Sequence, residues 1–199
     1  MTDLVARVRA LDSGSRVVLG LCGPPGAGKS TLAAHLVAEL GSSSVLVPLD
    51  GFHLHDDVLR AQGSLGRKGA PDTFDVRGYL ALLTRLRSDD GVVYAPAFDR
   101  SLETSLAGAI PVLPSHRIVV TEGNYLLLAG AWSGVRPLLD ACWFVDVDDE
   151  VRRARLVERN LRHGRSQEAA EEWVARVDGP NADLVAATRE LADYVVDAG

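Results

Sequence analysis

Apolar runs alternate with segments of helical periodicity along most of the chain. The runs predict five strands, at residues 17–22, 45–49, 117–121, 142–145 and 194–196. Segments with apolar side chains at every third or fourth position predict helices, at 32–40, 76–86, 151–165 and from about 167 onward. Strands separated by helices indicate an α/β fold of three layers, in which a parallel sheet is flanked by helices on both faces.

Two stretches depart from this alternation. Residues 51–75 are rich in glycine and polar side chains, which indicates functional loops around a short helix near 56–62. Residues 96–114 contain three prolines, which predict irregular structure or short edge strands because proline cannot donate a backbone hydrogen bond to a neighbouring strand.

Length and composition limit the architecture and the partners. A chain of 199 residues that is 47% hydrophobic can bury one core, so residues 1–199 are expected to form a single domain. The net charge of −6 argues against a nucleic-acid partner, since binding to the phosphate backbone depends on an excess of Lys and Arg. No signal peptide or membrane span is visible, and Cys22 and Cys142 lie in strand-like runs as buried thiols do in a reducing compartment. We therefore expect a cytoplasmic protein without a membrane partner.

One motif carries strong chemical information. Residues 23–31 fit G-x-x-x-x-G-K-[ST] and lie between the first predicted strand and the first predicted helix, the context that a phosphate-binding loop requires. In such a loop the backbone N–H groups bind phosphate, Lys29 places a positive charge near the β- and γ-phosphates, and Ser30 supplies a hydroxyl oxygen for Mg²⁺. The chain is therefore predicted to bind a nucleoside triphosphate through Gly23, Pro24, Pro25, Gly26, Ala27, Gly28, Lys29, Ser30 and Thr31.

Acidic residues follow other predicted strands. Ligands of parallel sheets bind at the carboxyl ends of the strands, so these residues are candidates for chemistry. Asp50 and Glu122 could supply the two carboxylates that phosphoryl transfer needs, one to take the proton of an acceptor hydroxyl and one to assist Mg²⁺. Asp148 or Asp149, in contrast, is better explained as a helix N-cap.

Together, several segments resemble a known family. They are the phosphate loop, the sequence LDGFH at 49–53, KGAPDTFD at 68–75, APAFDR at 95–100 and EGN at 122–124. This ordered set resembles the superfamily of phosphoribulokinase, uridine kinase and bacterial pantothenate kinase, and most of all its small bacterial members named nucleoside kinases or fructose-transport-system kinases. The resemblance implies the P-loop NTPase fold, ATP and Mg²⁺ as cofactors, and a small-molecule alcohol as acceptor. Relatives are commonly dimeric, so a homodimer is compatible with it.

The resemblance also implies roles for individual residues. Asp50 corresponds to the aspartate that acts as general base on the acceptor hydroxyl or orients it, and Glu122 to the acidic residue that supports Mg²⁺ or its water shell. Phe52 and His53 are expected to line the acceptor pocket, with a solvated loop histidine as the alternative for His53. Asp99 and Arg100 match a pocket segment that carries a tyrosine and often a histidine in relatives. Phe98 and Arg100 depart from that pattern, which leaves the acceptor's identity open.

An arginine-rich helix is the second informative feature. Arg152, Arg155, Arg159 and Arg162 follow steps of three and four, so they share one face. In an acidic chain such a face indicates a local anion site, and a solvated helix balanced by Glu150 and Glu158 is the alternative. The family resemblance makes residues 150–166 a small lid over the triphosphate, in which Arg155 and Arg159 match the lid pattern and join Lys29 as catalytic residues.

A polar segment precedes the end of the chain. Asn181-Ala182-Asp183 is predicted to open the last helix. Similar segments in relatives lie near the adenine, and a helix N-cap is the other interpretation of Asn181.

Two functions follow from these patterns. The favoured one is an ATP-dependent kinase that transfers the γ-phosphate of ATP to an alcohol of a metabolite, either a nucleoside as in uridine kinases or a sugar, with pantothenate also allowed. A phosphosugar would call for extra basic pocket residues, for which only Arg60, Arg67, Lys68 and Arg100 are candidates. The alternative is a nucleotide-hydrolysing switch or assembly factor, although the sequence lacks the Asn-Lys-x-Asp segment of a guanine-specific switch.

Overall fold

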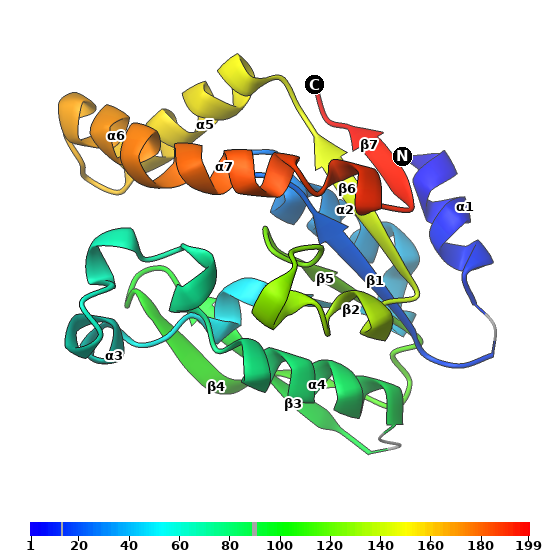
Figure 1. Ribbon diagram of the computed structural model, residues 1–199. Coiled ribbons are helices and arrows are strands. Elements are labelled where there is room, and N and C mark those ends of the chain that lie inside the picture. The colour runs from blue at the N-terminus through cyan, green and yellow to red at the C-terminus, as the bar shows by residue number, and fades with distance from the viewer. Residues whose placement is uncertain (13, 89–90) are drawn as a thin grey trace.

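The computed structural model describes residues 1–12, 14–88 and 91–199 (Figure 1). A five-stranded sheet, parallel throughout and in the order β2-β5-β1-β6-β7, forms its centre. The strands are β1 (Val17–Cys22), β2 (Ser44–Pro48), β5 (Ile118–Glu122), β6 (Ala141–Asp146) and β7 (Tyr194–Asp197). The helices are α1 (Thr2–Ala10), α2 (Lys29–Leu40), α3 (Asp56–Ala61), α4 (Val76–Ser88), α5 (Asp149–Arg162), α6 (Gln167–Trp173) and α7 (Gly179–Ala186). The predicted strands are confirmed within a few residues at their ends.

Helices cover both faces of the sheet, which confirms the three-layer α/β fold. All six residues of β1 are buried, and their side chains alternate between two cores. Val18 and Cys22 face a core shared with α4, α7 and residues 125–139, whereas Leu19 and Leu21 face a core shared with α1 and α2. A strand buried on both faces needs apolar side chains at every position, which is why these strands read as continuous apolar runs.

Residues 93–112 form a hairpin that is longer than the short edge strands predicted from the prolines. Strands β3 (Val93–Asp99) and β4 (Thr104–Val112) pair in antiparallel fashion, and the register shifts between Ala95 and Ala97. Pro96 therefore sits at the irregularity, where its missing N–H disturbs no ladder hydrogen bond. The hairpin forms its own two-stranded sheet, so each strand has an outer edge that tolerates proline.

The carboxyl ends of the parallel strands carry the polar residues. Strand β2 leads into a short 3₁₀ turn, η2 (Leu49–Phe52), and β6 leads to Asp148, which caps α5 by accepting a hydrogen bond from the N–H of Glu150 at 2.8 Å. The N-cap prediction for Asp148 is thus confirmed. In Figure 1, α5, α6 and α7 lie in the upper left of the view and α3 lies in the lower left. Within the described residues, none of the helices combines the length and apolar character needed to cross a lipid bilayer.

Candidate active site

A cavity of about 800 Å³ lies at the strand ends between the phosphate loop, the α5–α7 segment and the loop around α3. It brings together most of the predicted site residues: Lys29, Ser30, Asp50, His53, Arg100, Glu122, Arg155 and Arg159. Residues as far apart in sequence as Pro25 and Asn181 therefore meet at one place. The phosphate loop follows β1, Asp50 lies in the turn after β2, and Glu122 is the last residue of β5, as the strand-end rule predicts.

The structure places Phe52 and Asp99 outside the wall of this cavity. The ring of Phe52 belongs to the core, with its centroid 5.1 Å from that of Tyr79. The Asp99 carboxylate turns to its own loop, where it accepts hydrogen bonds from the N–H groups of Ser101 at 2.8 Å and Leu102 at 3.1 Å. Both residues belong to segments that reach the site. The apolar ring of Phe52 packs in the core, however, and Asp99, at a turn, accepts hydrogen bonds from the nearby backbone.

The phosphate loop has a backbone shape that glycine permits. Gly28, immediately before α2, has a φ of +92°, a left-handed conformation that side chains other than glycine rarely adopt. At Gly23 the backbone passes so close to β6 that an added Cβ would lie 2.5 Å from the carbonyl oxygen of Val145. The loop therefore brings the N-terminus of α2, with its positive dipole end, to the cavity.

Lys29 is buried at the base of the cavity, with an exposed fraction of 7%. Its Nζ donates hydrogen bonds to the carbonyl oxygen of Pro24 at 2.9 Å and to Oδ1 of Asn124 at 2.7 Å. Burial lowers the pKa of Lys29, and the negative charges of Glu122 and Asp50 oppose that shift. The ammonium group is thus held in place by weak neutral acceptors, which leaves it suited to a stronger anionic partner.

Ser30 and Glu122 form a hydrogen-bonded pair beside Lys29. The Ser30 hydroxyl donates to Oε1 of Glu122 at 2.9 Å, and Glu122 has an exposed fraction of 6%. Burial and the nearby charge of Asp50 raise the pKa of Glu122, while Lys29 and the Ser30 hydrogen bond lower it. A hydroxyl and a carboxylate are hard oxygen ligands, so this pair fits the chemistry of Mg²⁺.

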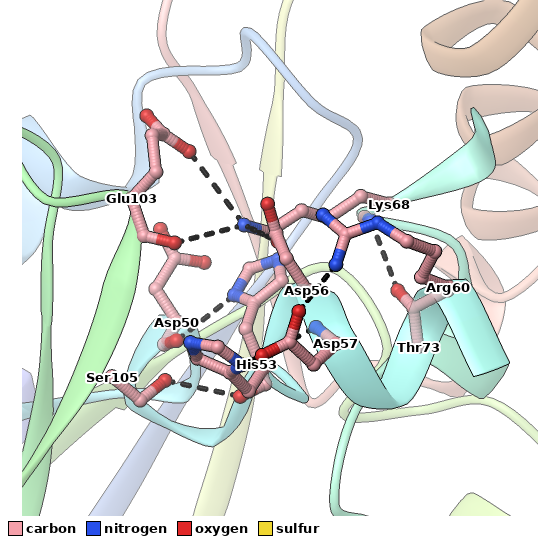
Figure 2. A network of polar contacts seen from close by, with 11 residues as sticks. Asp50, His53, Asp56, Asp57, Arg60, Lys68, Thr73, Glu103 and Ser105 are labelled. Carbon is pink, nitrogen blue, oxygen red and sulfur yellow. Dashed lines mark hydrogen bonds and ion pairs between the residues drawn. The ribbon is translucent and has the colours of Figure 1, made fainter. Parts of the chain in front are cut away.

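Asp50 lies in η2 and is paired with a residue of the hairpin. Its Oδ2 is 2.7 Å from Nη2 of Arg100. Its carbonyl oxygen is 2.9 Å from Nδ1 of His53 (Figure 2). The imidazole packs between Phe74 and Phe98, with ring centroids 4.0 and 5.0 Å away. Burial lowers the pKa of His53, although the charge of Asp50 opposes the shift. The packing rules out the solvated-loop alternative for His53, and it places a neutral imidazole on the cavity wall.

Of the four basic candidates for a phosphosugar pocket, only Lys68 and Arg100 line the cavity. Nζ of Lys68 donates to Oδ1 of Asp56 at 2.7 Å and to the carbonyl oxygen of Glu103 at 3.0 Å (Figure 2). Arg60 and Arg67 instead form exposed ion pairs with Asp57 and Asp72. The positive charges on this wall are therefore already paired within the protein.

Arginines of α5 form part of the opposite wall. Arg155, Arg159 and Arg162 line the cavity, as does Arg165 after the helix, whose guanidinium stacks 4.0 Å above the ring of Trp173. The prediction of one basic face is correct for these three helical residues. The fourth, Arg152, is buried instead, where it pairs with Asp149 and its Nη1 lies 3.4 Å from the carbonyl oxygen of Pro25. It fixes α5 against the phosphate loop.

A polar segment between α6 and α7 completes this wall. A π-helical turn, η7 (Val174–Asp178), follows α6 directly, and α7 begins at Gly179. Asn181 lies inside α7 and lines the cavity, so its interpretation as the N-cap is wrong. Asp178 precedes the helix and also lines the cavity, a role that sequence reasoning missed. The signal that could have located it is Pro180, because proline is favoured in the first turn of a helix.

Comparisons with known proteins agree with this geometry. The family model described as "Phosphoribulokinase / Uridine kinase family" matches residues 18–199. The chain belongs to this family. It is therefore a kinase, a phosphotransferase that acts on an alcohol group, and the predicted superfamily is confirmed.

Several relatives of this kinase span nearly its whole length. A solved structure from Silicibacter sp. TM1040, named as a proposed fructose transport system kinase, superposes with a TM-score of 0.91 at 37% identity and covers 98% of this chain and 97% of its own. The uncharacterized protein YggC of Escherichia coli is 32% identical over 99% of this chain and 84% of its own length. A uridine kinase of Leuconostoc citreum is 29% identical over 92% of this chain and 88% of its own length. Two of these three proteins are named kinases, and their names refer to different small molecules, fructose and uridine.

Proposed function

We propose that the protein is an ATP-dependent kinase that transfers the γ-phosphoryl group of ATP to an alcohol of a nucleoside, as in uridine kinases, or of a sugar. Pantothenate is the third acceptor that the family resemblance allows. The observation that carries the proposal is the single cavity in which a phosphate loop, the Ser30–Glu122 pair, Asp50 and lid arginines meet.

Positively and negatively charged groups both act at the end of the site that binds the phosphates. The loop N–H groups and Lys29 bind the phosphates of ATP, and Ser30 and Glu122 are the residues that would hold Mg²⁺. When bound, Mg²⁺ offsets the negative charge that repels an approaching nucleophile. Arg155 and Arg159 neutralise charge on the transferred group from the side of α5.

Asp50 takes the proton of the acceptor hydroxyl. The acceptor binds between η2 and the α5–α7 wall, where His53, Phe98 and Phe74 offer an imidazole and aromatic surface. When the hydroxyl enters, it replaces the guanidinium of Arg100 at the Asp50 carboxylate. The arginine-bearing segment 150–166 acts as a lid that excludes water, because a phosphoryl group exposed to water would be hydrolysed.

The test is release of ADP from ATP and Mg²⁺ in the presence of single acceptors, namely uridine, D-fructose and pantothenate. We expect one class of acceptor to stimulate release strongly. Asp50→Asn should reduce kcat by about 10²–10⁴-fold and leave the KM for ATP within about twofold, because a general base acts on the acceptor and not on ATP binding. Asp57→Asn is the matched control, since Asp57 is an exposed surface residue with the same charge. Slow release that no acceptor stimulates would favour the switch.

A further inference from the structure

The turn between β3 and β4 supplies a cation to the carboxylate of Asp50. Nη2 of Arg100 lies 2.7 Å from Oδ2 of Asp50, although 50 residues separate the two in sequence. The Arg100 side chain is 53% exposed and the Asp50 side chain 34% exposed, and both residues line the cavity. The group that would take the proton of an acceptor is therefore held in an ion pair with another part of the fold.

The hairpin is fixed against η2 on both sides of this turn. On β3, the backbone at Pro96 passes so close to Gly51 that an added Cβ on Gly51 would lie 2.4 Å from the Pro96 carbonyl oxygen. On β4, Oγ of Ser105 donates a hydrogen bond to the carbonyl oxygen of His53 at 3.1 Å (Figure 2). The packing of the hairpin thus determines where Arg100 lies.

The turn itself has a constrained conformation. Oδ1 of Asp99 accepts a hydrogen bond from the N–H group of Ser101 at 2.8 Å. Glu103 has a φ of +51°, which residues other than glycine rarely adopt, and its carbonyl oxygen accepts a hydrogen bond from Nζ of Lys68 at 3.0 Å (Figure 2). Such strain persists where the surrounding structure imposes it, and it is common at functional sites.

A guanidinium at Asp50 affects the competition between the acceptor and water. A carboxylate paired with a cation is held in its charged form and takes up a proton less readily than a free carboxylate. Because its two oxygens share one charge, the cation at Oδ2 weakens Oδ1 as a base too. In hydrolysis, water gives its proton to Asp50 while its oxygen bonds to the γ-phosphorus, and the bond from that phosphorus to the β,γ-bridging oxygen breaks. An alcohol reacts by the same step and gives a phosphate ester instead of inorganic phosphate.

The acceptor differs from water in the contacts that it makes elsewhere in the cavity. His53 and Phe98 line the wall beside Asp50, so a metabolite can bind to an imidazole and an aromatic ring as well as to the carboxylate. Binding energy from such remote contacts can be used to displace a competing group at the reacting centre. A half-exposed ion pair is weak, so a bound acceptor can displace the guanidinium, whereas a single water molecule lacks these contacts.

We infer that Arg100 makes phosphoryl transfer selective for the acceptor over water, because it occupies the Asp50 carboxylate until a bound acceptor displaces it. Arg100 acts through Asp50 and is therefore a positioning residue. The inference rests on the proposed kinase function and adds the group that limits loss of ATP by hydrolysis. If Arg100 instead bound the acceptor, its removal would have the opposite effect on the KM of the acceptor.

Hydrolysis of ATP without an acceptor tests the inference directly. Release of inorganic phosphate from ATP and Mg²⁺ is measured for wild type, Arg100→Gln, Arg100→Lys and the double variant Asp50→Asn/Arg100→Gln. We expect Arg100→Gln to raise the rate about fivefold, which corresponds to about 1 kcal/mol, the upper range for an exposed ion pair. Arg100→Lys keeps the positive charge and should stay within about twofold of wild type. The double variant should lose the increase, because the base that takes the proton of water is gone.

Arg67→Gln is the matched control. The Arg67 side chain is 50% exposed and forms an ion pair with Asp72, but it lies outside the cavity wall. This variant should hydrolyse ATP at the wild-type rate. Thermal unfolding of every variant shows whether a change in hydrolysis accompanies a loss of folded protein.

Acceptor kinetics give a second, independent readout. They are measured with whichever of uridine, D-fructose and pantothenate stimulates ADP release by wild type. We expect Arg100→Gln to lower the KM of that acceptor by up to about fivefold and to leave kcat within about threefold, because the guanidinium no longer has to be displaced. The inference is overturned if acceptor-free hydrolysis is unchanged in Arg100→Gln, or if the double variant keeps the increase. A higher KM of the acceptor would also overturn it and would assign Arg100 to acceptor binding.

Failure of the kinase function gives a different result. In that case wild type forms no phosphate ester with any acceptor, and the acceptor-free rates still decide the role of Arg100. An increase in Arg100→Gln that the double variant loses would support the role of Arg100 by itself. If an acceptor is phosphorylated while the acceptor-free rates of wild type and Arg100→Gln are equal, the kinase function stands and the inference is wrong.

Discussion

Gly51→Ala tests whether contacts of η2 with the hairpin hold Asp50 in its catalytic position. An added Cβ at residue 51 would lie 2.4 Å from the carbonyl oxygen of Pro96 and 2.7 Å from its carbonyl carbon. Both are backbone atoms, so no side-chain rotation relieves the contact. Ordinary contact begins at 3.4 Å, and η2 and β3 must therefore separate by about 1 Å. The backbone conformation of Gly51 is not left-handed, so the contact alone is the cause.

Two magnitudes follow from this displacement. Overpacking of this kind costs about 1–3 kcal/mol of unfolding free energy. At roughly 2–4 °C per kcal/mol for a domain of this size, Tm should fall by about 2–12 °C. A shift of about 1 Å in a catalytic group lowers kcat by about 10²-fold. The loss in kcat should therefore greatly exceed the loss expected from the fraction of unfolded protein.

The assay combines thermal unfolding with acceptor-stimulated ADP release, measured well below the Tm of the variant. Gly91→Ala is the control, because an added Cβ there meets no atom within 4 Å. It should leave Tm and kcat close to wild type. A Gly51→Ala variant with wild-type kcat would refute the idea that this contact positions Asp50.

Three further predictions concern the charged groups. Lys29→Met should lower kcat about 10²–10³-fold in the ADP-release assay because a buried positive charge at the phosphates is lost, and a normal kcat would remove Lys29 from catalysis. Arg100→Ala should change the unfolding free energy by less than about 1 kcal/mol, since its ion pair with Asp50 is half-exposed; a Tm loss beyond about 4 °C would contradict this. Burial lowers the pKa of His53 below 6.5, so the unfolded chain takes up the proton first and the native state loses stability as the pH falls through 6.5. Tm should consequently drop more steeply between pH 7.5 and 5.5 in wild type than in His53→Asn, and parallel curves would show that His53 is not the group.

The buried sheet could be predicted because each parallel strand is apolar on both faces. In β1 the continuous run of residues 17–22 leaves no polar position, and all six residues are buried. The N-terminal helix α1 was missed because only Val5 and Val8 are buried, which is too weak a periodic signal beside its charged residues. The length of the hairpin strands was underestimated because the number of prolines does not show which edge of a strand pairs with a neighbouring strand.

The site could be predicted where a local motif or a strand end determines a residue's place. Lys29, Ser30, Asp50 and Glu122 are such residues, and all four line the cavity. Motif matching places a segment but not the direction of each side chain, which is why Phe52 and Asp99 were expected in the cavity and lie elsewhere.

Contacts between side chains of distant segments could not be predicted from the sequence either. The ion pair of Arg100 with Asp50 and the unpartnered Oδ2 of Asp178 depend on how the hairpin and the α5–α7 segment pack around the strand ends. No spacing in the chain encodes these contacts.

Direct detection of the product tests the central claim, that the cavity transfers the γ-phosphoryl group of ATP to an alcohol. The measurement is ³¹P NMR of the reaction with ATP, Mg²⁺ and the acceptor that stimulates ADP release. The account predicts a phosphate-monoester signal that grows in equal amount with ADP and is nearly absent with Asp50→Asn. If all of the γ-phosphate appears as inorganic phosphate with every acceptor, the protein hydrolyses its nucleotide and the account is wrong.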